Sequence, residues 1–514
     1  MFLPTSFCRK ILLATSLLGF ASVTATAQNK VSKPNIIYIL ADDLGYGDLG
    51  CYGQTKIETP HIDALAKEGM LFTQHYSEPL CAPSRYALMT GKDGGNAYIR
   101  GNHEWGARGN VWDFKEMEAN PALEGQLPIP DSTVTIAKIL RKAGYHTAIV
   151  GKWGLGSPMT TGVPNKQGFD YFFGSICQRQ DHQYYPGHLW ENEQRVFLDN
   201  HIVDPNYKLA DSLDPSDAKS YMVKGQNDYA PDLMIRAALK YIKDNKDHPF
   251  FLYFPTPLPH ASMQAPARWV DYYHKKFGDE KPYLGGNYVP CQYPRATRAA
   301  MVGLLDEQVG QLVDALKAQG IYDNTIILLA GDNGPSNEGG ADCAFFNSGG
   351  LFPSSYGRGK GFLYEAGVRE PFIAYWKGRI KAGQRSELVS SFWDLVPTIC
   401  DLLQVRQPDD VDGISYLPTL LGNTQRQVQR PYLYWELADY NGQQAVRMGM
   451  WKGIRLNINK GNTKIKLFDL DNDLTEQHDV ADAHPDIVAQ MEKIMQQKHH
   501  KAEVSQFWLK GMDD

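Results

Sequence analysis

Pro34-Asn35-Ile36-Ile37-Tyr38-Ile39-Leu40-Ala41-Asp42-Asp43 is an unbroken apolar run that ends in two acids. A run without polar alternation is typical of a strand covered on both faces, as in the parallel sheet of an α/β protein. Residues 249–254 and 325–330 have the same character. These runs predict an α/β fold with a buried central sheet.

Two helices are expected between and beside these strands. Apolar residues recur near helical spacing over residues 299–319, which indicates an amphipathic scaffold helix. Residues 131–144 also have a helical pattern, with Asp131-Ser132-Thr133 as the expected cap.

Polar residues follow two of the buried strands. Asp42 and Asp43 end the first run, and Asp332 and Asn333 end the run over residues 325–330. Ligands bind at the carboxyl ends of strands in open α/β sheets, and clustered oxygen ligands are typical of Ca²⁺. A helix N-cap is the alternative for the first pair, because acids are also favoured there.

A small Cys-x-Pro-x-Arg element, within the stretch of residues 78–91, opens an expected helix. A thiol at a helix N-terminus is expected to have a lowered pKa, and Arg85, one turn later, adds positive charge on nearly the same face. The two residues would form an anion-binding site. The alternative is that Cys81 is an ordinary buried side chain.

Cys81-Ala82-Pro83-Ser84-Arg85, followed by Thr90-Gly91, resembles the signature of the type I sulfatases in the alkaline phosphatase superfamily. The resemblance covers nearly all of the chain after residue 27. It implies that a formylglycine-generating maturation enzyme oxidises Cys81 to formylglycine, whose hydrated aldehyde is the nucleophile. It also implies that both strand-end pairs bind one calcium ion, with position 81 as a further ligand.

The resemblance implies an alkaline-phosphatase-like fold. Its large domain has a central mixed, mostly parallel sheet flanked by helices, and a smaller C-terminal domain has a short antiparallel sheet and a helix. We therefore expect a catalytic domain over residues 28–425 and a C-terminal subdomain over residues 426–514. The polar span of residues 404–429 is the expected linker.

Other blocks match the family in order. Gly151-Lys152-Trp153-Gly154-Leu155-Gly156 is similar to the family's Gly-Lys-Trp-His-Leu-Gly, which implies that Lys152 binds sulfate. The family histidine helps to activate the nucleophile, but Gly154 occupies its position. His182 or His188 is a candidate to replace it.

Two further residues carry over from the family. His260, in Pro259-His260, is expected to protonate the leaving alcohol, because the ordinary pKa of histidine lies near neutrality. Lys360 lies in a Gly-Lys-x-x-x-x-Glu block and is implied to bind sulfate and the leaving group. Arg369 is expected to be a buried partner of Glu365 at i, i+4.

Two loops rich in aromatic and polar residues suggest a carbohydrate substrate, because aromatic faces stack on sugar rings and polar side chains read hydroxyls. We predict a sulfated galactose or N-acetylgalactosamine of a host or algal glycan. The alternatives are a phosphoester or phosphonate hydrolase of the same superfamily and a non-catalytic glycan-binding protein. The candidate substrate-binding residues are Gln178, His182, Arg100 and His103.

Residues 1–27 have the pattern of a secretory signal peptide, with an apolar run after Arg9-Lys10 and the cleavage pattern Ala25-Thr26-Ala27. We expect a periplasmic or secreted protein without membrane insertion. The formal net charge of −6 argues against nucleic acid as a partner. If Cys81 is chemically modified, five cysteines remain after residue 27, so at least one is unpaired.

Overall fold

The run after Pro34 forms strand β1 (Asn35–Ala41) in the middle of a large sheet. The computed structural model describes residues 33–513, and the expected signal peptide lies outside the described residues. Strand β1 pairs in parallel with β7 (Phe250–Thr256) on one side and with β8 (Thr325–Gly331) on the other. The three strands that the apolar runs predicted are therefore neighbours.

The large sheet is mixed and mostly parallel, as expected. Antiparallel pairing joins β2 to β9, β8 to β9, β4 to β5 and β5 to β6, and the other pairs are parallel. Beyond β1, β7 and β8, its strands are β2 (Met70–Tyr76), β3 (His146–Lys152), β4 (Tyr171–Ser175), β5 (His188–Glu191), β6 (Gln194–Phe197), β9 (Arg369–Tyr375), β10 (Gln384–Ser386) and β11 (Ser390–Ser391). Their order is β10-β2-β9-β8-β1-β7-β3-β4-β5-β6, with β11 beside β2.

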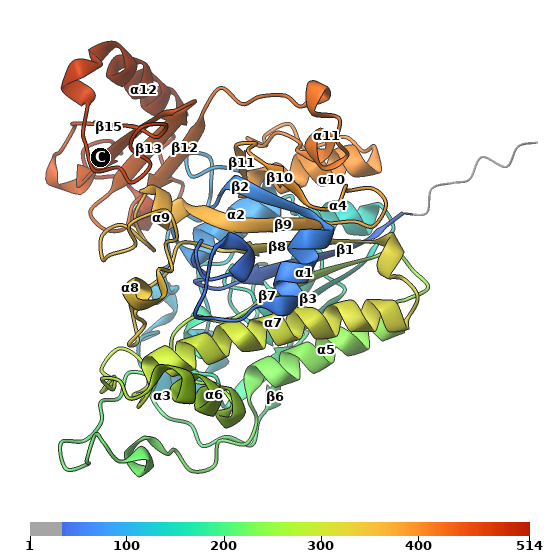
Figure 1. Cartoon of the computed structure of the whole chain (residues 1–514), viewed down its shortest axis with the longest axis vertical. Helices are drawn as coiled ribbons and strands as arrows, with labels where there is room; N and C mark the ends of the chain where they lie inside the picture. Colours follow the sequence, from blue (N-terminus) through green and yellow to red (C-terminus); the bar gives the residue numbers. More distant parts are fainter. Residues whose placement is uncertain (1–32, 514) are drawn as a thin grey trace, which may run out of the picture. The chain divides into compact units, whose positions relative to one another are not determined.

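Both faces of this sheet are covered, which explains the unbroken apolar runs. Ile36, Tyr38 and Leu40 of β1 point into one hydrophobic core, while Ile37 and Ile39 point into the other. The first core is shared with α2 (Cys81–Thr90), α4 (Ile136–Lys142) and α10 (Leu395–Leu403). The second is shared with α1 (Pro60–Glu68), α5 (Ala230–Asp244), α6 (Ala267–Phe277) and α7 (Pro294–Ala318), and Figure 1 shows α5 and α7 side by side. Four short helices complete this part: α3 (Phe114–Ala119), α8 (Cys343–Phe346), α9 (Glu365–Val368) and α11 (Leu417–Leu420).

Two helix starts differ from the sequence-based expectation. The cap expected at residues 131–133 is wrong: α4 begins at Ile136, and the Thr135 hydroxyl accepts a hydrogen bond from the backbone N–H of Lys138 at 3.2 Å. Helix α7 begins at Pro294, five residues before the apolar pattern, because proline is well suited to the first turn of a helix.

The C-terminal part has the predicted antiparallel sheet, with α12 (Pro485–Lys498) packed on it (Figure 1). Its strands are β12 (Leu433–Leu437), β13 (Gln443–Met448), β14 (Trp451–Leu456) and β15 (Lys466–Asp469). Trp435 Nε1 donates to the carbonyl of Ser77 at 2.8 Å, and Lys452 Nζ pairs with Glu365 Oε1 at 2.8 Å. Buried polar contacts thus tie this sheet to the segments next to β2 and β9 of the larger sheet, within a single compact unit.

All six cysteines between residues 33 and 513 are free thiols, which confirms that at least one is unpaired. None of the helices in this same range combines the length and apolar character that a bilayer span needs.

Candidate active site

Four neighbouring parallel strands end at one edge of the sheet and bring the predicted residues together. Strand β3 ends with Lys152, and β1 is followed by Asp42 and Asp43. Asp332 follows β8, and His260 lies in the loop after β7. Parallel strands place their carboxyl ends at the same edge, so residues more than 200 positions apart become neighbours.

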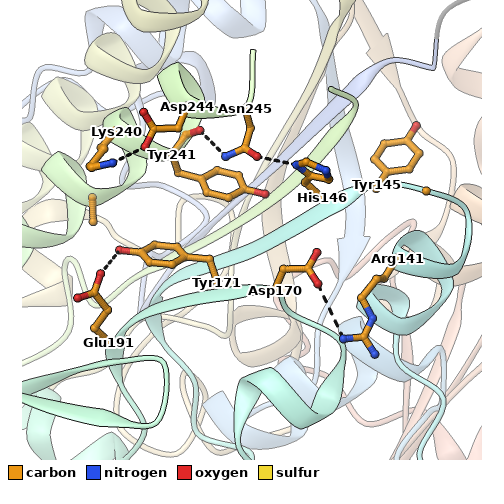
Figure 2. A pocket seen from close by; sticks show the side chains of 12 residues that line it. Arg141, Tyr145, His146, Asp170, Tyr171, Glu191, Lys240, Tyr241, Asp244 and Asn245 are labelled. Atoms are coloured by element: carbon orange, nitrogen blue, oxygen red, sulfur yellow. Dashed lines mark hydrogen bonds and ion pairs between the residues drawn. The ribbon is translucent and has the colours of Figure 1, made fainter. Parts of the chain in front are cut away.

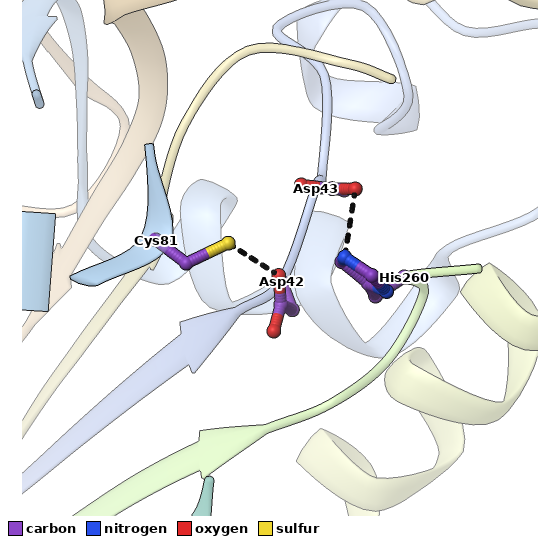
Figure 3. Close-up of side chains that lie close together, drawn as sticks. All are labelled: Asp42, Asp43, Cys81 and His260. Atoms are coloured by element: carbon purple, nitrogen blue, oxygen red, sulfur yellow. Dashed lines mark hydrogen bonds and ion pairs between the residues drawn. The ribbon is translucent and has the colours of Figure 1, made fainter. Parts of the chain in front are cut away.

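An oxygen-rich cluster lies at this edge (Figure 3). One ligand atom from each of Asp42, Asp43, Cys81 and His260 lies within 4.8 Å of the others. Asn333 belongs beside them, because its Nδ2 donates to Asp43 Oδ1 at 2.8 Å. Its Oδ1 is buried without a hydrogen-bond partner in the described part of the chain. A buried acceptor beside carboxylates fits a hard cation.

Asp332 is the remaining predicted metal ligand, and the structure orients it from both sides. Its Oδ1 accepts from the backbone N–H of Asp43 at 3.0 Å, and its Oδ2 accepts from Arg85 at 3.0 Å. Burial and the carboxylates of Asp42 and Asp43 raise the pKa of Asp332 to about 7, against the opposing charge of Arg85. The gathering of three buried carboxylates, with a raised pKa at one of them, is a second feature that fits a divalent cation.

Cys81 is the first residue of α2 and is buried, with Sγ 3.4 Å from Asp42 Oδ1. The expectation of a lowered thiol pKa is wrong. Burial, followed by the carboxylates of Asp332 and Asp42, raises the pKa of Cys81 well above its usual value, although Lys152 and Lys360 oppose the shift. Burial and the two carboxylates affect the thiol pKa more than the helix N-terminus does. The unmodified side chain is therefore a neutral thiol and not a thiolate nucleophile.

Arg85 organises the carboxylates. Its NH2 group lies 3.1 Å from Asp42 Oδ2 and 3.0 Å from Asp332 Oδ2, and its NH1 donates to the carbonyl of Lys152 at 2.8 Å. The guanidinium is fully buried. A planar fork that binds two acids and a strand end fixes all three in one geometry.

Two lysines add positive charge at the same place. Lys152 Nζ pairs with Asp42, and Lys360 Nζ lies 2.7 Å from Asp43 Oδ1. Burial would lower the pKa of each lysine, but the neighbouring carboxylate, Asp42 or Asp43 respectively, raises both. Both ammonium groups are therefore charged at neutral pH.

His260 lies between Asp43 and Lys360. Its Nε2 is 3.5 Å from Asp43 Oδ2 and 3.1 Å from Lys360 Nζ, while its Nδ1 bonds the carbonyl of Ala261. Burial and the Lys360 charge lower the pKa of His260, with Asp43 opposing. The resting imidazole is neutral, with Nε2 positioned to accept a hydrogen bond from Lys360.

The structure distinguishes the two histidines proposed to replace the family histidine. His182 stacks on His260, with ring centroids 5.5 Å apart. His188 is buried between Glu118 and Glu124, at 3.1 Å from each. His188 is thus held in a separate ion-pair cluster, and His182 is the one that contacts a site residue.

The other predicted substrate-binding residues lie in different settings. Gln178 packs against Gly154 and is buried. His103 is partly exposed and lies 2.7 Å from Asp439 Oδ1. Arg100 requires a correction: it is buried and pairs with Glu436 at 2.6 Å, and its other bonds go to backbone carbonyls. It holds the C-terminal sheet and is not free to bind a sugar.

Sequence reasoning missed two residues beside the site. Tyr288 packs on the rings of both His182 and His260, from a segment without regular structure. Arg298 donates to the carbonyl of Asp43 at 2.7 Å and pairs with Asp48. Arg298 lies just before the apolar pattern of residues 299–319, and neither it nor Tyr288 was marked by the sequence.

A cavity of about 740 Å³ lies at the opposite end of the sheet, where β3 and β4 begin (Figure 2). Its charged groups have protein partners: Lys240 pairs with Asp244, Arg141 lies 3.9 Å from Asp170, and Tyr171 bonds Glu191. It therefore lacks the converging cations of the strand-end cluster, and we place no chemistry there.

Comparisons with known proteins agree with this geometry. The sulfatase family model matches residues 34–405, and a model described as N-sulphoglucosamine sulphohydrolase, C-terminal, matches residues 357–501. An N-acetylgalactosamine-6-O-sulfatase of Bacteroides thetaiotaomicron is 32% identical over 519 residues, covering 90% of this chain and 93% of the relative. The human N-acetylgalactosamine-6-sulfatase is 32% identical over 453 residues, covering 85% and 75%. The crystal structure of Ps i-CgsB with k-i-k-neocarrahexaose has a TM-score of 0.70 at 27% identity, covering 94% of this chain and 96% of that one.

Proposed function

This chain belongs to the sulfatase family and is a sulfuric ester hydrolase, and we propose that it removes the 6-sulfate of N-acetylgalactosamine or galactose in a glycan. The environment of Cys81 is the observation that supports this reaction class. Its Sγ lies beside Asp42, and the charges of Arg85, Lys152 and Lys360 surround the acids at the same strand ends. N-acetylgalactosamine and the 6-position are proposed from the names of two relatives, and galactose is kept from the prediction made from the sequence.

The donor set fits calcium. Asp42, Asp43, Asp332 and Asn333 would hold the ion, which supplies positive charge toward the sulfate oxygens. Position 81 would complete the set with an oxygen, since a hard cation disfavours a soft sulfur ligand. Formylglycine made from Cys81 would supply, in its hydrated form, an oxygen nucleophile at the position of the neutral thiol.

The chain's own cations bind and orient the sulfate ester. Arg85 fixes the carboxylates of Asp42 and Asp332, so that their orientation does not change during the reaction. Lys152 and Lys360 are already charged, and an arriving sulfate shares them with Asp42 and Asp43. Their ammonium groups then offset the charge on the sulfate oxygens.

The proton for the leaving sugar oxygen is held at Lys360 and His260. His260 Nδ1 bonds the carbonyl of Ala261, which leaves Nε2 facing Lys360 Nζ across 3.1 Å. Either group can donate a proton to the departing oxygen: Lys360 from its ammonium group, and His260 once Nε2 has been protonated. A bound sulfate favours the charged imidazole by adding negative charge nearby.

Aromatic residues beside Lys360 support a sugar substrate. Tyr440 packs on Gly361, and its ring lies 5.0 Å from that of Phe362. Tyr356 packs against the same phenylalanine and is 85% exposed. Exposed rings next to the ammonium group that faces the leaving group offer a surface on which a sugar ring can stack.

The expected signal peptide supports export to the periplasm or medium, and maturation requires the formylglycine-generating enzyme. Sequencing of the N-terminus of the protein purified from its native host tests export. Cleavage after Ala27 is the expected result, and a retained Met1 refutes it.

Substrate choice is tested with N-acetylgalactosamine and galactose carrying sulfate at O3, O4 or O6, using protein matured together with that enzyme. We expect kcat/KM to be at least about tenfold higher for the 6-sulfates. A preference for another position refutes the substrate assignment, and faster hydrolysis of matched phosphate monoesters favours a phosphoester hydrolase. Cys400→Ala, at a buried cysteine of α10 outside the site, is the control for Cys81→Ala.

A further inference from the structure

Position 154 has no room for a side chain. Gly154 has φ +76°, a backbone conformation that residues with a Cβ rarely adopt. A Cβ built there would lie 2.4 Å from Nε2 and 3.0 Å from Cγ of Gln178. The side chain of Gln178 therefore fills the volume into which a residue at position 154 would project, the place where the family resemblance expected a histidine.

The backbone of Gln178 is fixed by its neighbours. It begins the short 3-10 helix η5 (Gln178–His182), which two residues separate from the end of strand β4. Ser175 of β4 is in register with Lys152 of β3, and the backbone N–H of Gln178 donates to Gln126 Oε1 at 3.1 Å. The helix η5 thus starts beside the segment that carries Lys152.

The other end of η5 lies at the opposite side of the catalytic cluster. His182, its last residue, stacks on His260. The helix therefore runs from the Lys152 side of the site to the His260 side. Gln178 lies at the end of η5 that is next to Lys152.

The side-chain amide of Gln178 has an unpaired hydrogen-bond donor. The side chain is buried, and its Nε2 has no hydrogen-bond partner among residues 33–513. Buried N–H groups in folded proteins nearly always have an acceptor, because leaving one unpaired is unfavourable. A ligand oxygen bound beside Gly154 would supply the missing acceptor.

The surrounding charges identify the kind of ligand. Arg85, Lys152 and Lys360 collect negative charge at these strand ends. Resting on the proposed function, we infer that Gln178 is a substrate-binding residue whose Nε2 donates a hydrogen bond to an oxygen of the sulfate group. A neutral amide from η5 thereby takes the donor position that Gly154 leaves empty.

This assignment has a consequence for the reaction. An amide donates but does not titrate, so Gln178 positions the sulfate without exchanging a proton with it. Proton transfer is left to His260 and Lys360. The contribution of Gln178 to sulfate binding should therefore be constant between pH 6 and pH 9.

The test uses Gln178→Met, which keeps the length of the side chain but removes the donor, and Gln178→Glu, which replaces the donor with a charge. Inorganic sulfate is titrated calorimetrically into each variant on a Cys81→Ala background. A hydrogen bond to a charged group is worth roughly 1.5–3 kcal/mol, which corresponds to a loss of about 10-fold to 150-fold in affinity for Gln178→Met. Gln178→Glu should bind still more weakly.

The control is Gln180→Ala, in the same turn, whose side chain faces His188. It should keep sulfate affinity within about threefold. Melting temperatures and kcat/KM for 4-nitrophenyl sulfate are measured in parallel on matured enzyme with Cys81 intact. A reduced sulfate affinity at unchanged melting temperature supports the assignment, and normal affinity in Gln178→Met overturns it, whatever happens to turnover. Neither probe contains a sugar, so failure of the 6-sulfate assignment would be seen separately.

Discussion

Arg85→Lys should damage the site far more than a conservative change of charge suggests. Arg85 makes three hydrogen bonds through two nitrogens, to Asp42, to Asp332 and to the carbonyl of Lys152. A lysine keeps the positive charge but places it on one nitrogen at the end of a flexible chain. It can satisfy one of these acceptors in good geometry, so two of the three hydrogen bonds are lost.

The size of the effect follows from the number of bonds lost. Hydrogen bonds to charged groups contribute roughly 1.5–3 kcal/mol each, so the loss of two costs about 3–6 kcal/mol. That is a large share of the roughly 5–15 kcal/mol by which folded domains are stable. Calcium affinity and sulfate affinity should fall as well, because the orientation of Asp42 and Asp332 is no longer fixed.

Arg369→Lys is the matched control, because Arg369 is also a buried arginine paired with an acid, Glu365, at 2.9 Å. Both variants are compared by urea denaturation and by sulfate titration on a Cys81→Ala background. Arg369→Lys should lose stability but keep its sulfate affinity within about threefold, whereas Arg85→Lys should lose both. The reasoning fails if Arg85→Lys binds sulfate as tightly as its parent, or if the two variants cannot be told apart.

Three further predictions concern the metal, a buried histidine and the aromatic surface. Removal of calcium by EGTA should abolish turnover and lower the melting temperature, and calcium should restore both; full activity after chelation contradicts the ligand assignment. His188, between Glu118 and Glu124, has its pKa raised to about 9, since their hydrogen bonds and charges outweigh burial. Its folded pKa is raised, so its stabilisation of about 3 kcal/mol is fully present below about pH 6.5 and is lost as the pH rises to about 9. His188→Gln should flatten urea stability over that range, and an unchanged slope refutes this. Tyr440→Ala should raise KM for a sulfated disaccharide about tenfold and leave 4-nitrophenyl sulfate unaffected; equal effects on both substrates would exclude sugar stacking.

Much of the fold was predictable because buried strands have an unbroken apolar sequence. The apolar runs of β1, β7 and β8 were recognisable, since strands covered on both faces need no polar alternation. Helix boundaries were less predictable. The Thr135 cap of α4 competed with three polar residues just before it, and the sequence does not show which hydroxyl meets the N–H of Lys138.

The site was predictable where the family motif and the strand ends coincide. Asp42, Asp43, Asp332 and Asn333 follow buried strands, and the fold brings them together as expected. The thiol pKa of Cys81 was not predictable, because burial and two carboxylates outweigh the helix terminus. Arg100 was misassigned because its partner, Glu436, is 336 residues away in the sequence.

The most direct test of the central claim is the mass of the tryptic peptide of residues 68–85, which contains Cys81, measured on enzyme of known specific activity. Preparations with and without the maturation enzyme, together with Cys81→Ser, supply a series of conversion levels. We predict that turnover of the 6-sulfated sugar rises in proportion to the converted fraction and is absent from Cys81→Ser made without the maturation enzyme. Full turnover by protein in which Cys81 is entirely unmodified would contradict the account.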